Sequence, residues 1–219
     1  MNDKGSVGFS KKYWDVNYSE PEEMDGIINA DRHAKYAKAF FDVDYVDISS
    51  IIDFGYGLGH LFKAFLNEFA PYRAHGIEPS EFAFNENKMG DFKKIPSMKL
   101  KIENTDLVSW ARGLGNEKWY DLGICTSVFQ YLTDDEIEEV LPILSEQVKY
   151  LYFSVPTDIE LDRQVSELEF KDEYAIHRSS TDYYQLISPY FTFLSARVLE
   201  SKFHSDENKT PFTDLLFRF

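Results

Sequence analysis

Three glycines at alternate positions carry the strongest chemical signal in this sequence. Gly55, Gly57 and Gly59 come directly after the apolar run 50–54 and directly before an apolar helical pattern that begins at His60. Glycine lets the chain turn tightly and lets the backbone approach a ligand closely. A helix that begins here would offer free N–H groups and a partial positive charge to an anionic group. The loop is therefore predicted to bind a ligand through its backbone.

An acidic residue ends the next apolar run and strengthens this prediction. Glu78 lies 19 residues after Gly59 in the sequence. The two oxygens of its carboxylate can accept the two neighbouring hydroxyls of a ribose. Simpler interpretations stay open from the residues alone, because the glycines can serve a plain turn and Glu78 can cap a helix beginning at Ser80.

The glycine spacing separates two kinds of nucleotide site. A nicotinamide or flavin fingerprint has its third glycine one position later, where this chain has His60. A pyrophosphate site also benefits from small residues, and Tyr56 lies within the loop. The spacing favours S-adenosylmethionine (SAM) as the cofactor, with an NAD-dependent oxidoreductase as the less favoured alternative.

The elements that must position these residues alternate along the chain between short apolar runs and amphipathic stretches. This alternation is typical of an α/β fold with a mainly parallel sheet. Strands are predicted over residues 50–54, 73–78, 98–102, 121–126 and 148–155. Helices are predicted over residues 22–41, 60–69, 80–88, 161–170 and 181–187, and from a capping box at Thr133 and Glu136.

The C-terminal part departs from this alternation. Residues 191–203 and 212–219 look like two β-runs, joined by the polar stretch 205–211. That stretch is too short for a crossover helix, so the two runs are predicted to pair in an antiparallel manner. The sheet is thus expected to be parallel with one reversed strand near its C-terminal end.

Composition limits the class of protein and its partners. The chain has 219 residues, of which 43% are hydrophobic, which fits one compact domain with a substantial core. A net charge of −15 opposes binding to a nucleic-acid backbone. No secretory signal or membrane-length apolar run is visible, and the single cysteine, Cys125, excludes an internal disulfide. We expect a cytoplasmic monomer or homodimer with neither membrane nor nucleic-acid partners and no metal.

Four motifs in order resemble those of the class I SAM-dependent methyltransferases, especially the group that acts on small molecules. The resemblance covers residues 50–219, and its motifs are residues 51–59, 76–80, 104–107 and 119–132. It implies a Rossmann-like three-layer sandwich with a seven-stranded, mainly parallel sheet and an antiparallel C-terminal strand. Residues 1–219 would form a single methyltransferase domain, with an N-terminal cap and helix over 1–45 and the core over 46–219.

The resemblance also implies the roles of individual residues. The glycine loop would hold the methionine portion of SAM, Glu78 the ribose, and Asp106 with Leu107 the adenine. From the residues alone, Asp106 also fits a helix N-cap, and the N-terminal aromatics around Trp14 also fit ordinary core packing. The implied cofactor site consists of Asp53, Gly55, Tyr56, Gly57, Gly59, Glu78, Pro79, Asp106, Leu107, Thr126 and Trp14.

The implied reaction transfers a methyl group from SAM to an oxygen or nitrogen atom of a small molecule and leaves S-adenosylhomocysteine (SAH). A protein side chain is a further possible acceptor. His177, between two late helices, is the candidate general base, although a surface histidine is the plainer interpretation. A non-catalytic SAM- or nucleoside-binding protein, or a partner subunit with this fold, is the alternative, because fold does not fix function.

Overall fold

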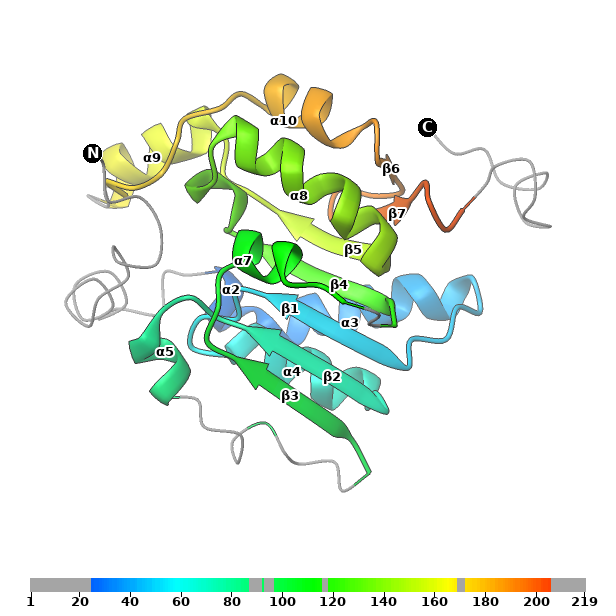
Figure 1. The fold of residues 1–219 in the computed structure, drawn as a ribbon. Helices are drawn as coiled ribbons and strands as arrows, with labels where there is room; N and C mark the ends of the chain where they lie inside the picture. Colours follow the sequence, from blue (N-terminus) through cyan, green and yellow to red (C-terminus); the bar gives the residue numbers. More distant parts are fainter. Residues whose placement is uncertain (1–24, 87–91, 93–96, 116–117, 169–171, 206–219) are drawn as a thin grey trace. The chain divides into compact units, whose positions relative to one another are not determined.

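The computed structural model describes residues 25–86, 92, 97–115, 118–168 and 172–205. These residues fall into two compact units that divide between Trp110 and Ala111 (Figure 1). Each unit is described by itself. The prediction of a single domain over residues 1–219 stays a prediction.

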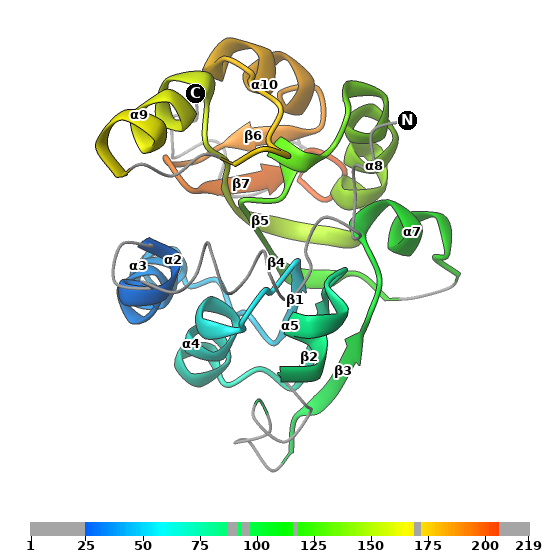
Figure 2. The same cartoon turned by 90° about the vertical axis from the view of Figure 1, so that its left-hand side faces the viewer.

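Three parallel strands form the sheet of the first unit, in the order β3-β2-β1. The strands are β1 (Ser50–Phe54), β2 (Arg73–Ile77) and β3 (Lys99–Glu103). The helices are α2 (Asp25–Ile28), α3 (Ala30–Val43), α4 (His60–Phe69), α5 (Glu81–Glu86) and α7 (Leu107–Arg112), the last of which crosses the division between the units. Helices α3 and α4 pack against each other on one face of these strands (Figure 2).

The apolar pattern explains why these elements form. Every residue of β1 is buried, which is typical of a parallel strand covered on both faces. Helix α3 buries alanines and Phe41 at three- and four-residue spacings. The ring of Phe41 meets that of Phe69 on α4 edge to face, with centroids 6.3 Å apart. The predicted helix over residues 60–69 is confirmed with the same bounds.

The second unit continues the alternation and ends in reversed strands. Strand β4 (Tyr120–Thr126) pairs in parallel with β5 (Val148–Ser154), which pairs with the antiparallel strand β7 (Val198–Ser201). Strand β6 (Phe191–Phe193) pairs antiparallel with β7, so the order in this unit is β4-β5-β7-β6. The helical elements are the 3-10 turn η3 (Phe129–Tyr131), α8 (Asp134–Gln147), α9 (Asp158–Leu168) and α10 (Ser180–Ile187).

One sequence-based assignment needs correction. The run 191–203 is two strands of a hairpin, β6 and β7, and the reversed strand lies within this run. Ser195 breaks the run, because its hydroxyl accepts the backbone N–H groups of Arg197 at 3.2 Å and Val198 at 3.0 Å. The second predicted run, 212–219, lies outside the described residues.

The predicted fold class is confirmed. The sheet has seven strands, is mainly parallel, carries the antiparallel β7 near its C-terminal end, and alternates with helices. The helix that begins after Thr133 also has the predicted capping box, with Thr133 and Glu136 bonded to each other's backbone. Within the ranges that the structure describes, no helix combines the length and the apolar character needed to cross a bilayer.

Candidate functional site

The glycine loop after β1 requires glycine at all three positions. The φ angles are 94° at Gly55, 53° at Gly57 and 78° at Gly59, all in the left-handed half of backbone space. A side chain at such an angle costs about 1–2 kcal/mol per residue. The loop bonds to its own unit through the N–H of Gly55, which donates to the carbonyl of Ile77 at 2.8 Å. Its backbone is therefore held in one conformation.

Tyr56 turns away from the loop and into the apolar part of the unit. Its ring stacks on Phe62 of α4 and meets Phe92 edge to face, and only 6% of the residue is exposed. A Cβ atom at Gly76 on β2 would lie 2.8 Å from Cδ1 of Tyr56, so the tyrosine ring fills the space that glycine leaves there. Burial, and then the charges of Glu78 and Asp53, raise the pKa of Tyr56. Tyr56 thus anchors the loop through its ring.

Glu78 lies directly after β2 and is bonded to the glycine loop. Its Oε2 accepts the N–H of Gly57 and its Oε1 accepts the N–H of Ser80, each at 2.8 Å. The residue is 3% exposed. Burial raises the pKa of Glu78 to about 7, although both backbone donors act in the opposite direction. The charged form of such a buried carboxylate is stabilised by a ligand that brings further hydrogen-bond donors.

A second buried acid lies on the neighbouring strand. Asp53 pairs in register with Gly76 and is 3% exposed. Burial raises the pKa of Asp53 well above its ordinary value, and the charge of Glu78 raises it further. Two buried carboxyl groups at the ends of adjacent strands suit a ligand that carries hydroxyl groups and positive charge, as SAM does. The residues present therefore fit the predicted cofactor.

The turn after β3 holds the predicted adenine residues. Asp106 caps α7: its Oδ1 accepts the backbone N–H of Ser109 at 2.8 Å, and its Oδ2 accepts the hydroxyl of Ser109 at 2.7 Å. Leu107 is buried at the start of α7. The capping interpretation of Asp106 is thus confirmed, and its contact with adenine stays a prediction. Pro79 is half-buried after Glu78, and its carbonyl accepts the side chain of Asn104 at 3.2 Å.

The remaining predicted residues lie in the second unit or outside the description. Thr126 is half-buried at the end of β4, followed by Ser127 with φ 55°, and Cys125 beside it is fully buried. His177 is exposed on the connection between α9 and α10, with its Nδ1 3.8 Å from Oδ1 of Asp162. Trp14 lies outside the described residues. The structure leaves the roles of Thr126, His177 and Trp14 as predictions.

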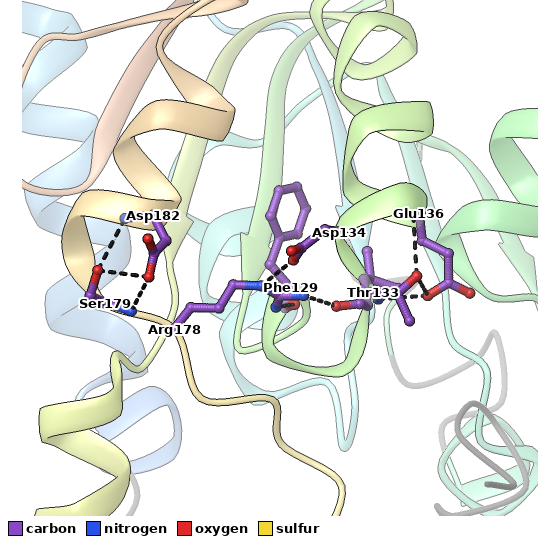
Figure 3. A network of polar contacts seen from close by, with 8 residues as sticks. Phe129, Thr133, Asp134, Glu136, Arg178, Ser179 and Asp182 are labelled. Carbon is purple, nitrogen blue, oxygen red and sulfur yellow. Dashed lines mark hydrogen bonds and ion pairs between the residues drawn. The ribbon is translucent and has the colours of Figure 1, made fainter.

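A buried arginine that was not predicted from the sequence lies beside His177. Arg178 is 6% exposed, and its Nε donates to Oδ1 of Asp134 at 2.7 Å (Figure 3). Its other nitrogens donate to the carbonyls of Phe129 at 3.2 Å and Leu132 at 2.6 Å. All three partners lie 44 to 49 residues earlier in the chain, so no local pattern marks this contact.

Further hydrogen bonds, besides those of Arg178, attach residues 172–178 to the connection between β4 and α8. The hydroxyl of Tyr131 donates to Oδ2 of Asp172 at 2.6 Å. The N–H of Ile176 donates to the carbonyl of Gln130 at 2.7 Å. A capping box of Ser179 and Asp182 then begins α10 directly after Arg178 (Figure 3). These bonds hold residues 172–178 against the connection that follows β4 within this unit.

The sequence matches no protein-family model and no curated protein. Solved structures do match the fold. Magnesium protoporphyrin IX methyltransferase from Synechocystis, with bound SAH, has a TM-score of 0.58 at 17% identity, over 90% of this chain and 94% of that enzyme.

Two further solved structures also match the fold of this chain. An S-adenosylmethionine-dependent methyltransferase from Clostridium acetobutylicum has a TM-score of 0.63 at 10% identity, over 87% of this chain and 99% of that one. The N-methyltransferase NodS from Bradyrhizobium japonicum has a TM-score of 0.57 at 12% identity, over 80% of this chain and 98% of that enzyme. This chain therefore has the Rossmann-like fold of the class I SAM-dependent methyltransferases.

Proposed function

We propose that this protein is a SAM-dependent methyltransferase that transfers a methyl group to an oxygen or nitrogen atom of a small molecule. The observation that carries the proposal is the buried carboxylate of Glu78, bonded to Gly57 of the glycine loop at 2.8 Å. The fold supports it, because solved enzymes with this fold include one with bound SAH and an N-methyltransferase.

The residues of the first unit would hold SAM by complementary chemistry. The N-terminus of α4, which begins directly after the glycine loop, suits the carboxylate of the methionine portion. Glu78 would accept ribose hydroxyls with the lone pairs that Gly57 and Ser80 leave open. Asp53 adds a second buried carboxyl group, whose raised pKa a cationic ligand would lower. Pro79, Asp106 and Leu107 would border the adenine.

When bound, SAM supplies a methyl group on a positively charged sulfur, which makes it ready for direct displacement. The protein's main task is then to hold the acceptor atom in line with that methyl group and to exclude water. An acceptor hydroxyl or ammonium must also lose a proton, and His177 is the candidate base for that proton. Its exposed imidazole is accessible to a proton donor, and its Nδ1 lies 3.8 Å from Oδ1 of Asp162.

Transfer of a labelled methyl group tests the function. SAM labelled in the methyl group would be incubated with fractionated small-molecule extract and, separately, with protein extract. We expect label in a small-molecule fraction for the wild type, loss of transfer for Glu78→Gln, and full transfer for the control Glu81→Gln on exposed α5. Label only in protein would identify a protein side chain as the acceptor.

Two other outcomes would contradict the proposal. Binding of SAM without transfer to any fraction would favour the non-catalytic nucleoside-binding protein or the partner subunit. Binding of NADH in place of SAM, measured by fluorescence, would favour the oxidoreductase.

A further inference from the structure

Asn104 joins the end of β3 to the residues that carry the candidate ribose site. Its Nδ2 donates to the carbonyl of Glu78 at 2.8 Å and to the carbonyl of Pro79 at 3.2 Å. Asn104 itself lies on the surface after Glu103, the last residue of β3. A surface amide that spends both its N–H groups on two consecutive carbonyls fixes the main chain at that turn.

The contacts of Glu78 show what Asn104 adds. Strand pairing extends one residue beyond β2, since the N–H of Glu78 donates to the carbonyl of Glu103 at 3.1 Å. The side chain is held by the N–H groups of Gly57 and Ser80. The carbonyl of Glu78 is held by Asn104. Asn104 thus holds the main-chain carbonyl of Glu78 while the glycine loop and Ser80 hold its carboxylate.

We propose that Asn104 is a positioning residue for the cofactor, which sets the recognition of ribose hydroxyls by holding the main chain of Glu78 and Pro79. The inference rests on the proposed SAM site and deepens it. A carboxylate recognises two hydroxyls only if its oxygens are held in the right plane, because hydrogen bonds weaken steeply with angle. Loss of the amide donor frees the turn, so the carboxylate loses this geometry.

Two substitutions separate the donor from the shape of the side chain. Asn104→Asp keeps the shape, removes the N–H donors, and places a negative charge against two carbonyl oxygens. Asn104→Ala removes the contact without adding charge, and it serves if the aspartate variant folds poorly. The matched control is Asn85→Asp, which makes the same chemical change at an exposed position of α5.

The experiment compares adenosine with 2′,3′-dideoxyadenosine by calorimetry, with SAH measured on the same samples. Wild type should bind adenosine at least about tenfold more tightly than 2′,3′-dideoxyadenosine, as expected for hydrogen bonds to a charged group. In Asn104→Asp the ratio of the affinities for adenosine and dideoxyadenosine should fall towards one, and SAH should bind about tenfold more weakly than to the wild type. Asn104→Ala should lower the ratio in part, and Asn85→Asp should keep the wild-type ratio.

The ratio distinguishes positioning from general damage to the site. If Asn104 has only a structural role, both nucleosides weaken equally in the variants and the ratio stays at its wild-type value, which overturns the inference. If the wild type discriminates and both Asn104 variants discriminate equally well, the inference is also wrong while the proposed function stands. If the wild type binds neither SAH nor adenosine, the proposed function fails and takes this inference with it.

Discussion

The backbone N–H of Gly57 donates to Oε2 of Glu78 at 2.8 Å, across 21 residues of sequence. This bond joins the loop after β1 to the carboxylate after β2. Parallel strands place their carboxyl ends at the same edge of a sheet, which is where α/β folds bind ligands. Two features that are separate in the sequence therefore belong to one site.

The raised pKa of Glu78 predicts how stability depends on pH. Folding raises this pKa from 4.5 to about 7, so the native state binds the proton more tightly than the unfolded state. The stabilisation is fully present below pH 4.5 and is lost as pH rises through about 7. Urea unfolding of the ligand-free protein should therefore show a decline in stability over that range. The decline should be shallower in Glu78→Gln, and equal slopes for the two proteins would contradict the assignment.

Ligand binding should lower the raised pKa of Glu78 again and so release protons. Ribose hydroxyls that donate to Glu78 favour its charged form, so the pKa falls when the ligand binds. SAH should bind more tightly as pH rises through about 7, where free Glu78 titrates. Calorimetry at neutral pH in buffers of different ionisation enthalpy measures the protons released. We expect net release for the wild type and less for Glu78→Gln; uptake would contradict ribose binding by this carboxylate.

Gly76 should not tolerate a larger side chain. A Cβ there would lie 2.8 Å from the ring of Tyr56 and 3.0 Å from that of Phe62. Gly76→Ala should therefore lower the free energy of unfolding by about 1–3 kcal/mol, as overpacking of a core does. The control is Gly115→Ala, where an added Cβ meets nothing within 4 Å. The double variant Tyr56→Ala/Gly76→Ala should lose less stability than the sum of the two single losses, and simple additivity of the two changes would show that the ring of Tyr56 does not clash with the added Cβ.

Substitution of Arg178 should lower the free energy of unfolding far more than substitution of its partner Asp134. Arg178→Met leaves the carbonyls of Phe129 and Leu132 without this donor, and bonds to a charged group contribute about 1.5–3 kcal/mol each. Urea unfolding should show a loss of about 2–4 kcal/mol. Asp134→Asn should cost less than about 1 kcal/mol, because the side chain of Asp134 is 70% exposed. A loss for Arg178→Met no larger than that for Arg163→Met on the surface of α9 would contradict this account.

The sequence predicted the elements best where their apolar residues form a clear pattern. Helix α4 has the predicted bounds because its apolar stripe has a helical period, and strand β1 has them because its short apolar run ends at a glycine loop. Helix α7 entered the sequence analysis only through the alternative that Asp106 caps a helix, since six residues contain too few turns to show a period. The hairpin of β6 and β7 was predicted as one run, because the break depends on the hydroxyl of one serine, Ser195.

The residues of the candidate site were likewise predicted only where a local sequence pattern marks them. Gly57 follows one predicted strand and Glu78 ends the next, so topology alone brings them to one edge. The contacts of Asn104 and Arg178 join loops that are distant in sequence, and such pairs leave no local pattern. The inward turn of Tyr56 depends on the missing side chain of Gly76, a match that only the packed structure shows.

Binding of SAH to the wild type and to Gly57→Val tests the central claim most directly. Gly57 has φ 53°, which a β-branched residue adopts only with strain, and its N–H is the one bonded to Glu78. Calorimetry should show one SAH per wild-type chain, binding at least tenfold weaker in Gly57→Val, and wild-type binding in the control Gly115→Val. Equal affinity of wild type and Gly57→Val for SAH would contradict the claim that this loop holds the cofactor.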